Sequence, residues 1–388
     1  MFLFLFTGLL YYQYHLVISE TFMKKVFKYL IILVIAGCNT VQAQQEIGKE
    51  KVQEDTADYY REGVKYALLG DYDEAVRLFE LAPSLDVVSV HLELAEMLRT
   101  GVLVTQNLEE SYKWYQLPAQ QGDAHSQVAL GLMLGFGYGI APDYTRALGW
   151  FRLAADQNDA EAQFYVGLAY GQGRGVAFDY TKAAEWFRLS ANQGNYFAQN
   201  HLGIYSENGS GVPQDDQAAA KYYQLAAKQG YAKAQYNLGY LHLNGTGVLK
   251  DESEALTLFQ LAADQGYGLA QNTLGFIYKN GEIVSQDYEI ASKWFHLAAE
   301  QGLIDAQDSL GYTYYSGRGV SIDFVKAHKW FRLAAEQGSD YAQSYLGIMY
   351  QEGQGVEQDF QEAIKWYRLA ASQGDATAQK NLKRLEQR

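Results

Sequence analysis

The chain has 388 residues, of which 48% are hydrophobic, enough to bury a sizeable core. Its formal net charge of −14 argues against a nucleic-acid partner, because phosphate binding needs clustered Lys and Arg. The single cysteine, Cys38, excludes an internal disulfide framework and a cysteine-based metal site within one chain.

Residues 1–37 have the pattern of a secretory signal rather than of a fold. Three lysines among residues 24–28 precede an apolar run and then the small residues before Cys38. A chain that starts at Met23 matches the pattern of a signal peptide best, so residues 1–22 are interpreted as an over-extended gene start. The ending Ile35-Ala36-Gly37-Cys38 resembles a bacterial lipoprotein box. That resemblance implies an acylated Cys38 as the mature N-terminus, and Asn39 after it is compatible with sorting to the outer membrane.

Two alternatives stay open for this segment: a signal cut after Ala43, and an uncleaved membrane anchor. The lipoprotein interpretation predicts a protein of the bacterial cell envelope, lipid-anchored at the outer membrane and facing the periplasm. The cut after Ala43 predicts a periplasmic or secreted protein. Residues 38–56 are polar and lack aromatic side chains, which predicts a flexible linker between anchor and fold.

Residues 57–86 open the folded part. Apolar and small residues recur there at helical spacing on two segments that break at Gly70-Asp71. The twelve-residue step from Gly63 to Ala75 resembles a tetratricopeptide unit, and Pro83 ends it.

A tandem repeat of thirty-six residues then runs from 87 to 374 in eight copies without insertion. Its last position is Gly122, Asn158, Gly194, Gly230, Gly266, Gly302, Gly338 and Gly374. Residues 375–388 begin a ninth copy with its first helix only. Lys383 replaces the small residue expected there, so this segment is predicted to be a capping helix with a solvated outer face.

Each copy predicts two amphipathic helices and a tight loop. The first helix carries a small residue, such as Gly347, which costs about 1 kcal/mol of helix propensity and is expected to let the second helix approach closely. All six tryptophans share one position of the second helix, where a ring and its aromatic neighbour are expected to fill the layer between stacked helices. In the loop Gly173-Arg174-Gly175-Val176-Ala177-Phe178-Asp179 the glycines permit positive φ and Asp179 is placed to cap the second helix.

The pattern resembles the Sel1-like repeat, a relative of the tetratricopeptide repeat. The resemblance covers residues 87–388 and implies an all-α, right-handed solenoid of antiparallel helix pairs whose first helices line the concave side. Proteins of that family are mostly scaffolds and adaptors. Local departures are expected only to bend the superhelix slightly; they are Leu103 and Ile283 in place of glycine, and Ser111 in place of alanine.

The candidate site consists of residues that vary between copies and point into the groove. By analogy with tetratricopeptide grooves these are the third, sixth, tenth and thirteenth positions of each unit. They supply Phe164, Phe197, Asn200, Tyr236, Tyr240, Asn272, Phe276, Tyr312, Tyr315 and Tyr341. Aromatic rings with amide groups suit an extended peptide or a sugar chain. The alternative, that these positions belong to the core between helices, stays open, above all for the tenth position.

Catalytic patterns are not found. The six histidines after Cys38 occupy six different positions of the repeat, and there is no HExxH or nucleophile elbow. We therefore expect no catalysis, no cofactor and no metal. Two hypotheses remain for the function: an envelope scaffold that binds a protein or peptide in its groove, and a carbohydrate-binding component of polysaccharide export or cell-wall handling. The sequence leaves open the partner's identity and the oligomeric state.

Overall fold

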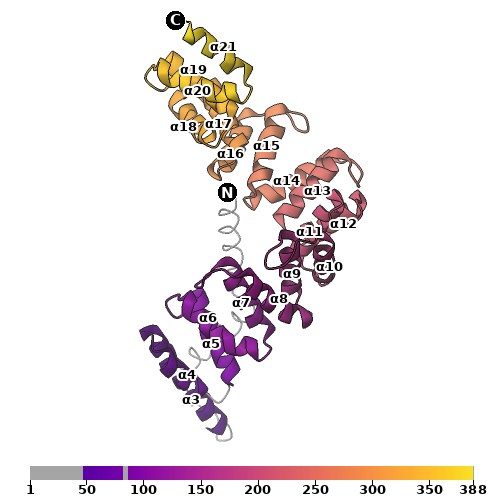
Figure 1. Ribbon diagram of the computed structural model, residues 1–388, viewed down its shortest axis with the longest axis vertical. Helices are drawn as coiled ribbons and strands as arrows, with labels where there is room; N and C mark the ends of the chain where they lie inside the picture. Colours follow the sequence, from indigo (N-terminus) through magenta and orange to yellow (C-terminus); the bar gives the residue numbers. More distant parts are fainter. Residues whose placement is uncertain (1–46, 82–85, 388) are drawn as a thin grey trace. The chain divides into compact units, whose positions relative to one another are not determined.

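The structure is a computed structural model that describes residues 47–81 and 86–387. Nineteen α-helices and no strands form this described part of the chain. They come in pairs joined by short loops, and helices that follow one another in the sequence pack together (Figure 1). The predicted all-α solenoid of helix pairs is therefore confirmed.

The contacts divide the chain into two compact units, one ending at Ser190 and one beginning at Ala191. The helices of the first unit are α3 (Ile47–Leu69), α4 (Tyr72–Glu80), α5 (Val87–Thr100), α6 (Leu108–Gln120), α7 (Ala124–Phe136), α8 (Tyr144–Asp156), α9 (Ala160–Gln172) and α10 (Tyr180–Asn192), which ends just past the boundary. Those of the second unit are α11 (Tyr196–Asn208), α12 (Asp216–Lys228), α13 (Ala232–Asn244), α14 (Glu252–Asp264), α15 (Gly268–Asn280), α16 (Tyr288–Glu300), α17 (Ile304–Ser316), α18 (Phe324–Glu336), α19 (Asp340–Glu352), α20 (Phe360–Ser372) and α21 (Ala376–Glu386). We name the odd-numbered helices from α5 onward A helices and the even-numbered ones from α6 onward B helices.

Helix α3 corrects one expectation from the sequence. It begins at Ile47, so residues 47–56 are helical and not part of a flexible linker. This stretch, GKEKVQEDT after Ile47, is rich in Glu, Lys and Gln, which are good helix formers as well as typical linker residues. The composition of residues 47–56 alone could not distinguish a helix from a flexible linker. Residues 1–46, including Cys38 and the signal segment, lie outside the described residues.

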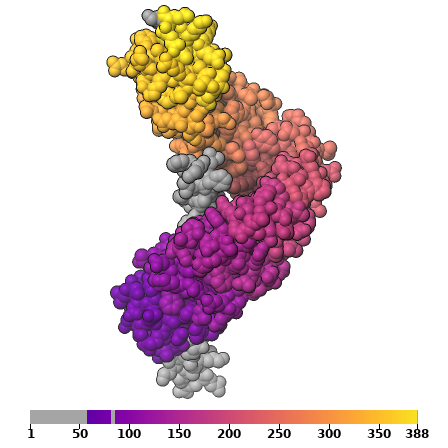
Figure 2. All heavy atoms as spheres, viewed as in Figure 1, coloured from indigo at the N-terminus to yellow at the C-terminus, as the bar shows by residue number. Residues whose placement is uncertain are grey.

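A glycine in each A helix from α7 to α19 lies against an aromatic ring of the paired B helix. At Gly311 an added Cβ would lie 2.7 Å from Phe331 Cδ1, closer than real side chains pack. The same holds in every other pair of this type, at 2.4 to 2.8 Å, for Gly131, Gly167, Gly203, Gly239, Gly275 and Gly347. The predicted close approach is confirmed. Side chains close the spaces between neighbouring ribbons within each unit (Figure 2).

The tryptophans pack between repeats, whereas the aromatic ring beside each one packs within its own helix pair. Trp330 of α18 is 6% exposed and belongs to the same buried cluster as Phe295 and Ala298 of the preceding B helix. Phe331, next to it, is fully buried against the glycine of α17. Both rings therefore fill layers between helices, as expected: the tryptophan fills the layer between repeats, and its neighbour fills the layer within one helix pair.

Loop residues behave as the repeat predicts. The Asp323 carboxylate accepts the backbone N–H of Lys326 at 2.9 Å and so caps α18. The same cap recurs at Asp143, Asp179, Asp215, Asp251, Asp287 and Asp359. The second loop glycine, for example Gly319 with φ of +79°, lies against the backbone of Tyr288 one repeat earlier, where a Cβ would not fit. Leu103 occupies that position in the first copy with φ of +69° and an exposed side chain.

A buried glutamine in six of the A helices joins consecutive repeats, and this connection is visible only in the structure. Gln307 of α17 is 4% exposed; its Nε2 donates to the Ala299 carbonyl of α16 at 3.2 Å, and its Oε1 accepts from Gln337 Nε2 at 2.8 Å. Gln337 ends α18, so one amide connects three helices. Equivalent pairs are Gln127–Gln157, Gln199–Gln229, Gln235–Gln265, Gln271–Gln301 and Gln343–Gln373.

Candidate functional site

Two of the predicted groove residues lie in the core. Phe164 is 2% exposed, and its ring lies 5.7 Å from that of Phe187, so it packs within the α9–α10 pair. Asn200 is 3% exposed and accepts a hydrogen bond from Asn237 Nδ2 at 3.2 Å. Neither side chain is accessible to a partner. The other eight lie in the second unit and are partly or well exposed.

Aromatic rings gather on α11 and α13, in a group that we name the first tyrosine cluster. Its members lie on these two A helices or directly before α13 or α15; they are Tyr196, Phe197, Tyr231, Tyr236, Tyr240 and Tyr267. Tyr231 joins both neighbouring rings of α11 at 5.2 Å, and Tyr236 lies 5.0 Å from Tyr240 and 5.3 Å from Tyr267. Tyr240 is 40% exposed. Of the predicted residues, Tyr236 and Tyr240 therefore contact each other, whereas Phe197 contacts Tyr231.

A second tyrosine cluster lies on α17 and α19 and consists of Tyr312, Tyr315, Tyr341 and Tyr345. Tyr345 is at its centre: its ring lies 5.8, 5.2 and 4.8 Å from the rings of the other three. Tyr345 stacks in turn on Phe331 of the preceding repeat at 4.9 Å, which fixes its position. Three of the four were predicted; Tyr345, at the seventh position of its unit, was not.

The remaining predicted residues lie on α15. Phe276 packs against Phe295 with a centroid distance of 5.1 Å and carries Lys279 above its ring at 5.2 Å. Asn272, on the same helix, has a buried side-chain oxygen without a hydrogen-bond partner in the described chain. Arg318, in the loop after α17, lies 5.7 Å above Tyr312. Burial, together with the nearby charge of Arg318, lowers the pKa of Lys279.

Three consecutive A helices at these clusters begin without a side-chain cap. The first position of the unit is an Asp, Asn or Ser that caps α7, α9, α11 and α19. At α13, α15 and α17 it is Tyr231, Tyr267 and Leu303. A missing cap of this kind costs about 1 kcal/mol. Both tyrosines instead place their rings in the first tyrosine cluster. A comparison of the first position across copies could have found them in the sequence.

Asp308 is a further residue that the sequence interpretation missed. It has the same repeat position as Asn200, Tyr236 and Asn272, and lies partly buried on α17. Its Oδ2 accepts from Ser339 Oγ at 2.7 Å, whereas its buried Oδ1 has no partner among the described residues. Burial raises the pKa of Asp308 to about 6; the Ser339 hydroxyl opposes the rise, and nearby Asp305 and Asp340 add to it.

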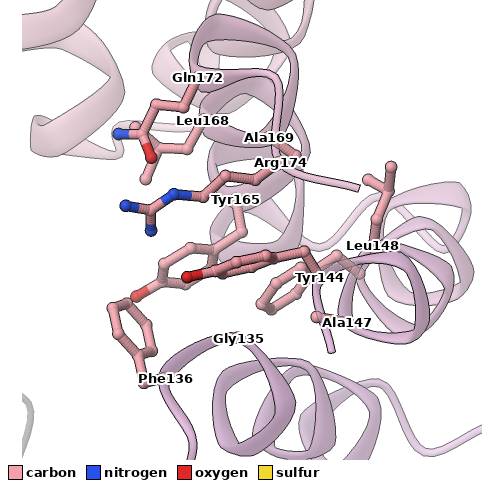
Figure 3. Close-up of a pocket in the computed structure, with 11 residues that line it drawn as sticks. Gly135, Phe136, Tyr144, Ala147, Leu148, Tyr165, Leu168, Ala169, Gln172 and Arg174 are labelled. Atoms are coloured by element: carbon pink, nitrogen blue, oxygen red, sulfur yellow. The ribbon is translucent and has the colours of Figure 1, made fainter. Parts of the chain in front are cut away.

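The first unit contains a pocket of about 50 Å³ between α7, α8 and α9 (Figure 3). Its walls are mostly apolar, with Phe151 stacked on Tyr165 at 4.8 Å and the Arg174 guanidinium 5.2 Å above Tyr144. Such a volume holds only a few water molecules. The Arg-on-Tyr pair recurs between Arg318 and Tyr288, so it is a contact between repeats. We assign this pocket to packing.

A charged cluster links α5, α6 and α7 in the same unit. Glu96 is 5% exposed and accepts hydrogen bonds from Arg99 and from Tyr115, and its Oε1 lies 2.7 Å from His125 Nε2. Burial would raise the pKa of Glu96, but the hydrogen bond from His125 and the Arg99 charge outweigh it and lower the pKa to about 2. The hydrogen bond to Glu96 raises the pKa of His125. All polar groups of this cluster pair with one another, which indicates a structural role.

Neither a metal site nor a membrane span is evident in the described part of the chain. No three His, Cys, Asp or Glu side chains there come together in a way that could hold a metal ion. Among the helices that the structure describes, none has the length and apolar character needed to cross a membrane.

The fold and these surfaces define a solenoid repeat protein that presents aromatic side chains on one set of helices. The Sel1 repeat family matches residues 52–84, 89–123, 124–159, 160–195, 197–231, 232–267, 268–303, 304–339 and 340–375. The chain therefore belongs to the Sel1 repeat family. The first matched segment falls on the stretch that resembled a tetratricopeptide unit. No curated protein matches the chain.

Two solved structures are similar to the chain along most of its length. One is c5321, a protective antigen present in uropathogenic Escherichia coli strains that displays an SLR fold. It shares 30% sequence identity and a TM-score of 0.58, with 88% of this chain and 82% of that chain covered. The other is a Sel1 repeat protein from Oxalobacter formigenes, with 30% identity, a TM-score of 0.59, and coverage of 83% and 93% respectively.

Proposed function

We propose that the chain is a non-catalytic scaffold that binds an extended segment of a partner protein along the A helices of the second unit. One observation carries this proposal: aromatic side chains replace the helix caps of α13 and α15, at a cost in stability, and join an exposed tyrosine cluster. Proteins depart from local stability rules mainly where a function requires it. Sel1 repeat proteins are, as a class, interaction scaffolds, which supports the same interpretation.

The chemistry of the surface fits a peptide. Tyrosine rings supply large, rigid contact area at a small entropic cost, and their hydroxyl groups pair with peptide carbonyl groups. Lys279 lies above the ring of Phe276, and burial lowers the pKa of this lysine. A partly buried lysine favours an acceptor from a bound chain over bulk water.

Photo-crosslinking in the cell envelope tests this proposal. A photoreactive residue in place of Tyr240 should trap one dominant partner, and the same residue in place of Gln224, exposed on the B helix α12, should not. The Tyr236→Ala, Tyr240→Ala double variant should lose that partner from a crosslinker placed at Phe197 while keeping its helical circular dichroism. Equal trapping of the partner from positions 240 and 224 would overturn the proposal. Unchanged trapping in the folded double variant would also overturn it.

A carbohydrate ligand is the second candidate, and the stacking capacity of the same tyrosine rings favours it. Sugar rings bind on aromatic faces with polar groups at the edge, and Asn237 and Lys233 lie on α13 beside the first tyrosine cluster. A glycan array probed with the full chain separates the two functions. If no glycan binds at about millimolar concentration, a level that detects even weak complexes, the carbohydrate function is excluded.

We further propose that Cys38 is lipidated and tethers the solenoid at the outer membrane, facing the periplasm. The support is the sequence around Cys38 and the description of the E. coli relative as a protective antigen, which fits a protein of the cell envelope. The Cys38→Ser variant should abolish incorporation of labelled fatty acid and release the protein from membranes. Continued labelling would contradict lipidation, and a mature N-terminus at residue 44 would support a signal cut after Ala43.

A further inference from the structure

Asp308 has an unused acceptor beside the second tyrosine cluster. Its Oδ2 accepts from Ser339 Oγ, and the Ser339 hydroxyl oxygen itself accepts the Ala342 backbone N–H at 3.0 Å as the cap of α19. The hydroxyl group is therefore held in place, with its only proton directed at Asp308. The other carboxylate oxygen, Oδ1, is buried and has no donor from the described residues. Rotation about the broad terminal torsion of an aspartate can present either oxygen to a ligand.

The surroundings of Asp308 are negative. Asp305 and Asp340 both add to the rise in the pKa of its carboxyl group. The ion pairs formed within residues 47–81 and 86–387 include none of these three carboxylates. A cation that enters here would therefore gain attraction from three acidic groups without displacing an existing positive charge.

Tyrosine rings border the same carboxylate. Tyr341 follows two residues after Ser339, the residue that holds Asp308. Burial raises the pKa of Tyr341, and the hydrogen bond with Tyr345 adds to the rise. Tyr341 is 40% exposed and lies 4.8 Å from the ring of Tyr345. Aromatic faces attract Lys and Arg side chains, and the attraction is stronger where water is partly excluded. The arrangement thus combines a carboxylate with aromatic walls.

We propose that Asp308, with Tyr341 and Tyr345, binds a lysine or arginine side chain of the partner segment. This inference rests on the peptide-binding function proposed above and names what the peptide must carry. Lys279 and Arg318 border Phe276 and Tyr312 on the same set of helices, so a second basic side chain there would be repelled. The surface should therefore prefer a peptide with one Lys or Arg at the position that reaches Asp308 over a peptide that is basic along its whole length.

Selection from a phage-displayed library of random linear peptides on the full chain tests the inference. Enriched peptides should share one Lys or Arg. Asp308→Asn should weaken their binding at least about tenfold, as expected for the loss of a charge-assisted hydrogen bond. Glu357→Gln is the matched control, because it removes the same charge from an exposed loop residue of the same unit and should leave Kd unchanged.

A double-mutant cycle assigns the effect to the proposed pair. Replacing the shared Lys or Arg of the peptide with Gln should weaken binding to the native chain but not to the Asp308→Asn variant. If the peptides depend on Tyr236 and Tyr240 but show no coupling to Asp308, the cation site is wrong and the peptide-binding function stands. If Asp308→Asn and Glu357→Gln weaken peptide binding equally, the loss of binding reflects the net charge of the chain and the inference is overturned. If no linear peptide is enriched, the proposed function fails and the inference with it.

Discussion

Gln337 donates its side-chain amide to Gln307 at 2.8 Å, and Gln307 in turn donates to the backbone of the preceding B helix. The bond from Gln307 to Ala299 couples its repeat to the one before it. In a solenoid, stability is the sum of repeat and interface contributions, so a polar contact that recurs at most junctions affects the cooperativity of the whole array.

Replacing Gln307 with Ala should lower the free energy of unfolding by about 1 to 3 kcal/mol, because Gln337 loses its acceptor and a small cavity forms. Urea denaturation followed by circular dichroism measures the change. Gln361→Ala, on the exposed surface of α20, is the control and should alter stability by less than about 0.5 kcal/mol. If Gln307→Ala and Gln361→Ala lower the free energy of unfolding equally, the junction does not depend on the buried glutamine.

Two glycines in one helix pair should respond in opposite directions to alanine. At Gly131 an added Cβ would lie 2.5 Å from Phe151, so Gly131→Ala should destabilise the chain by about 1 to 3 kcal/mol. Gly149 lies in the interior of α8 with no neighbour within 4 Å of its added Cβ, so Gly149→Ala should stabilise by about 1 kcal/mol. Thermal melts of the two variants decide; the same sign for both would contradict the close-packing argument.

Glu96 should make a stability contribution that depends on pH. Its folded pKa of about 2 lies below the usual value of 4.5, so the native state binds fewer protons than the unfolded state between these values. The contribution is fully present above pH 4.5 and is lost as the pH falls toward about 2. Glu96→Gln should therefore cost about 3 kcal/mol at neutral pH, as for other buried ion pairs that lose one partner, and much less at pH 2. Denaturant titrations at several pH values measure this, and a cost independent of pH would contradict it.

Asp308 should behave in the opposite way. Its folded pKa of about 6 lies above the usual 3.8, so the native state binds more protons than the unfolded state in between. The stabilising contribution of the Asp308 carboxyl group is fully present below pH 3.8 and is lost as the pH rises through about 6. Asp308→Asn should hence stabilise the chain at pH 7 and have little effect near pH 3.5. Since the variant is expected to fold well, any loss of peptide binding that it shows reports the site itself.

The repeat made most of the fold predictable, because each glycine, cap and tryptophan contacts only its own or the adjacent copy. The position of Gly311 opposite Phe331, for example, follows from a comparison of copies. Glu96, Arg99, Tyr115 and His125 could not be found that way, since their cluster joins four different repeat positions that occur together once. Phe164 was placed in the groove because repeat position alone cannot tell which way a ring turns, and Phe187 draws it into the core.

Asp308 was missed for a related reason. Its aspartate differs from the asparagines and tyrosine at the same position of other copies, but only the structure shows that Ser339, two residues before Tyr341, holds it. Sequence comparison identified the surface on which partner residues lie. The pairing of charge with aromatic rings on that surface depends on contacts between copies, which vary from one junction to the next.

The glutamine pair has a consequence for how such an array changes in length. Because six of the units carry both the amide that reaches back and the acceptor that the end of the same unit's B helix uses, a copy of such a unit inserted by tandem duplication finds its polar partners at either junction. Arrays can therefore lengthen or shorten by whole units over evolution, or in the hands of a protein engineer, without new compensating substitutions. The tyrosine clusters have no such freedom, since removal of one unit would separate the rings that they bring together.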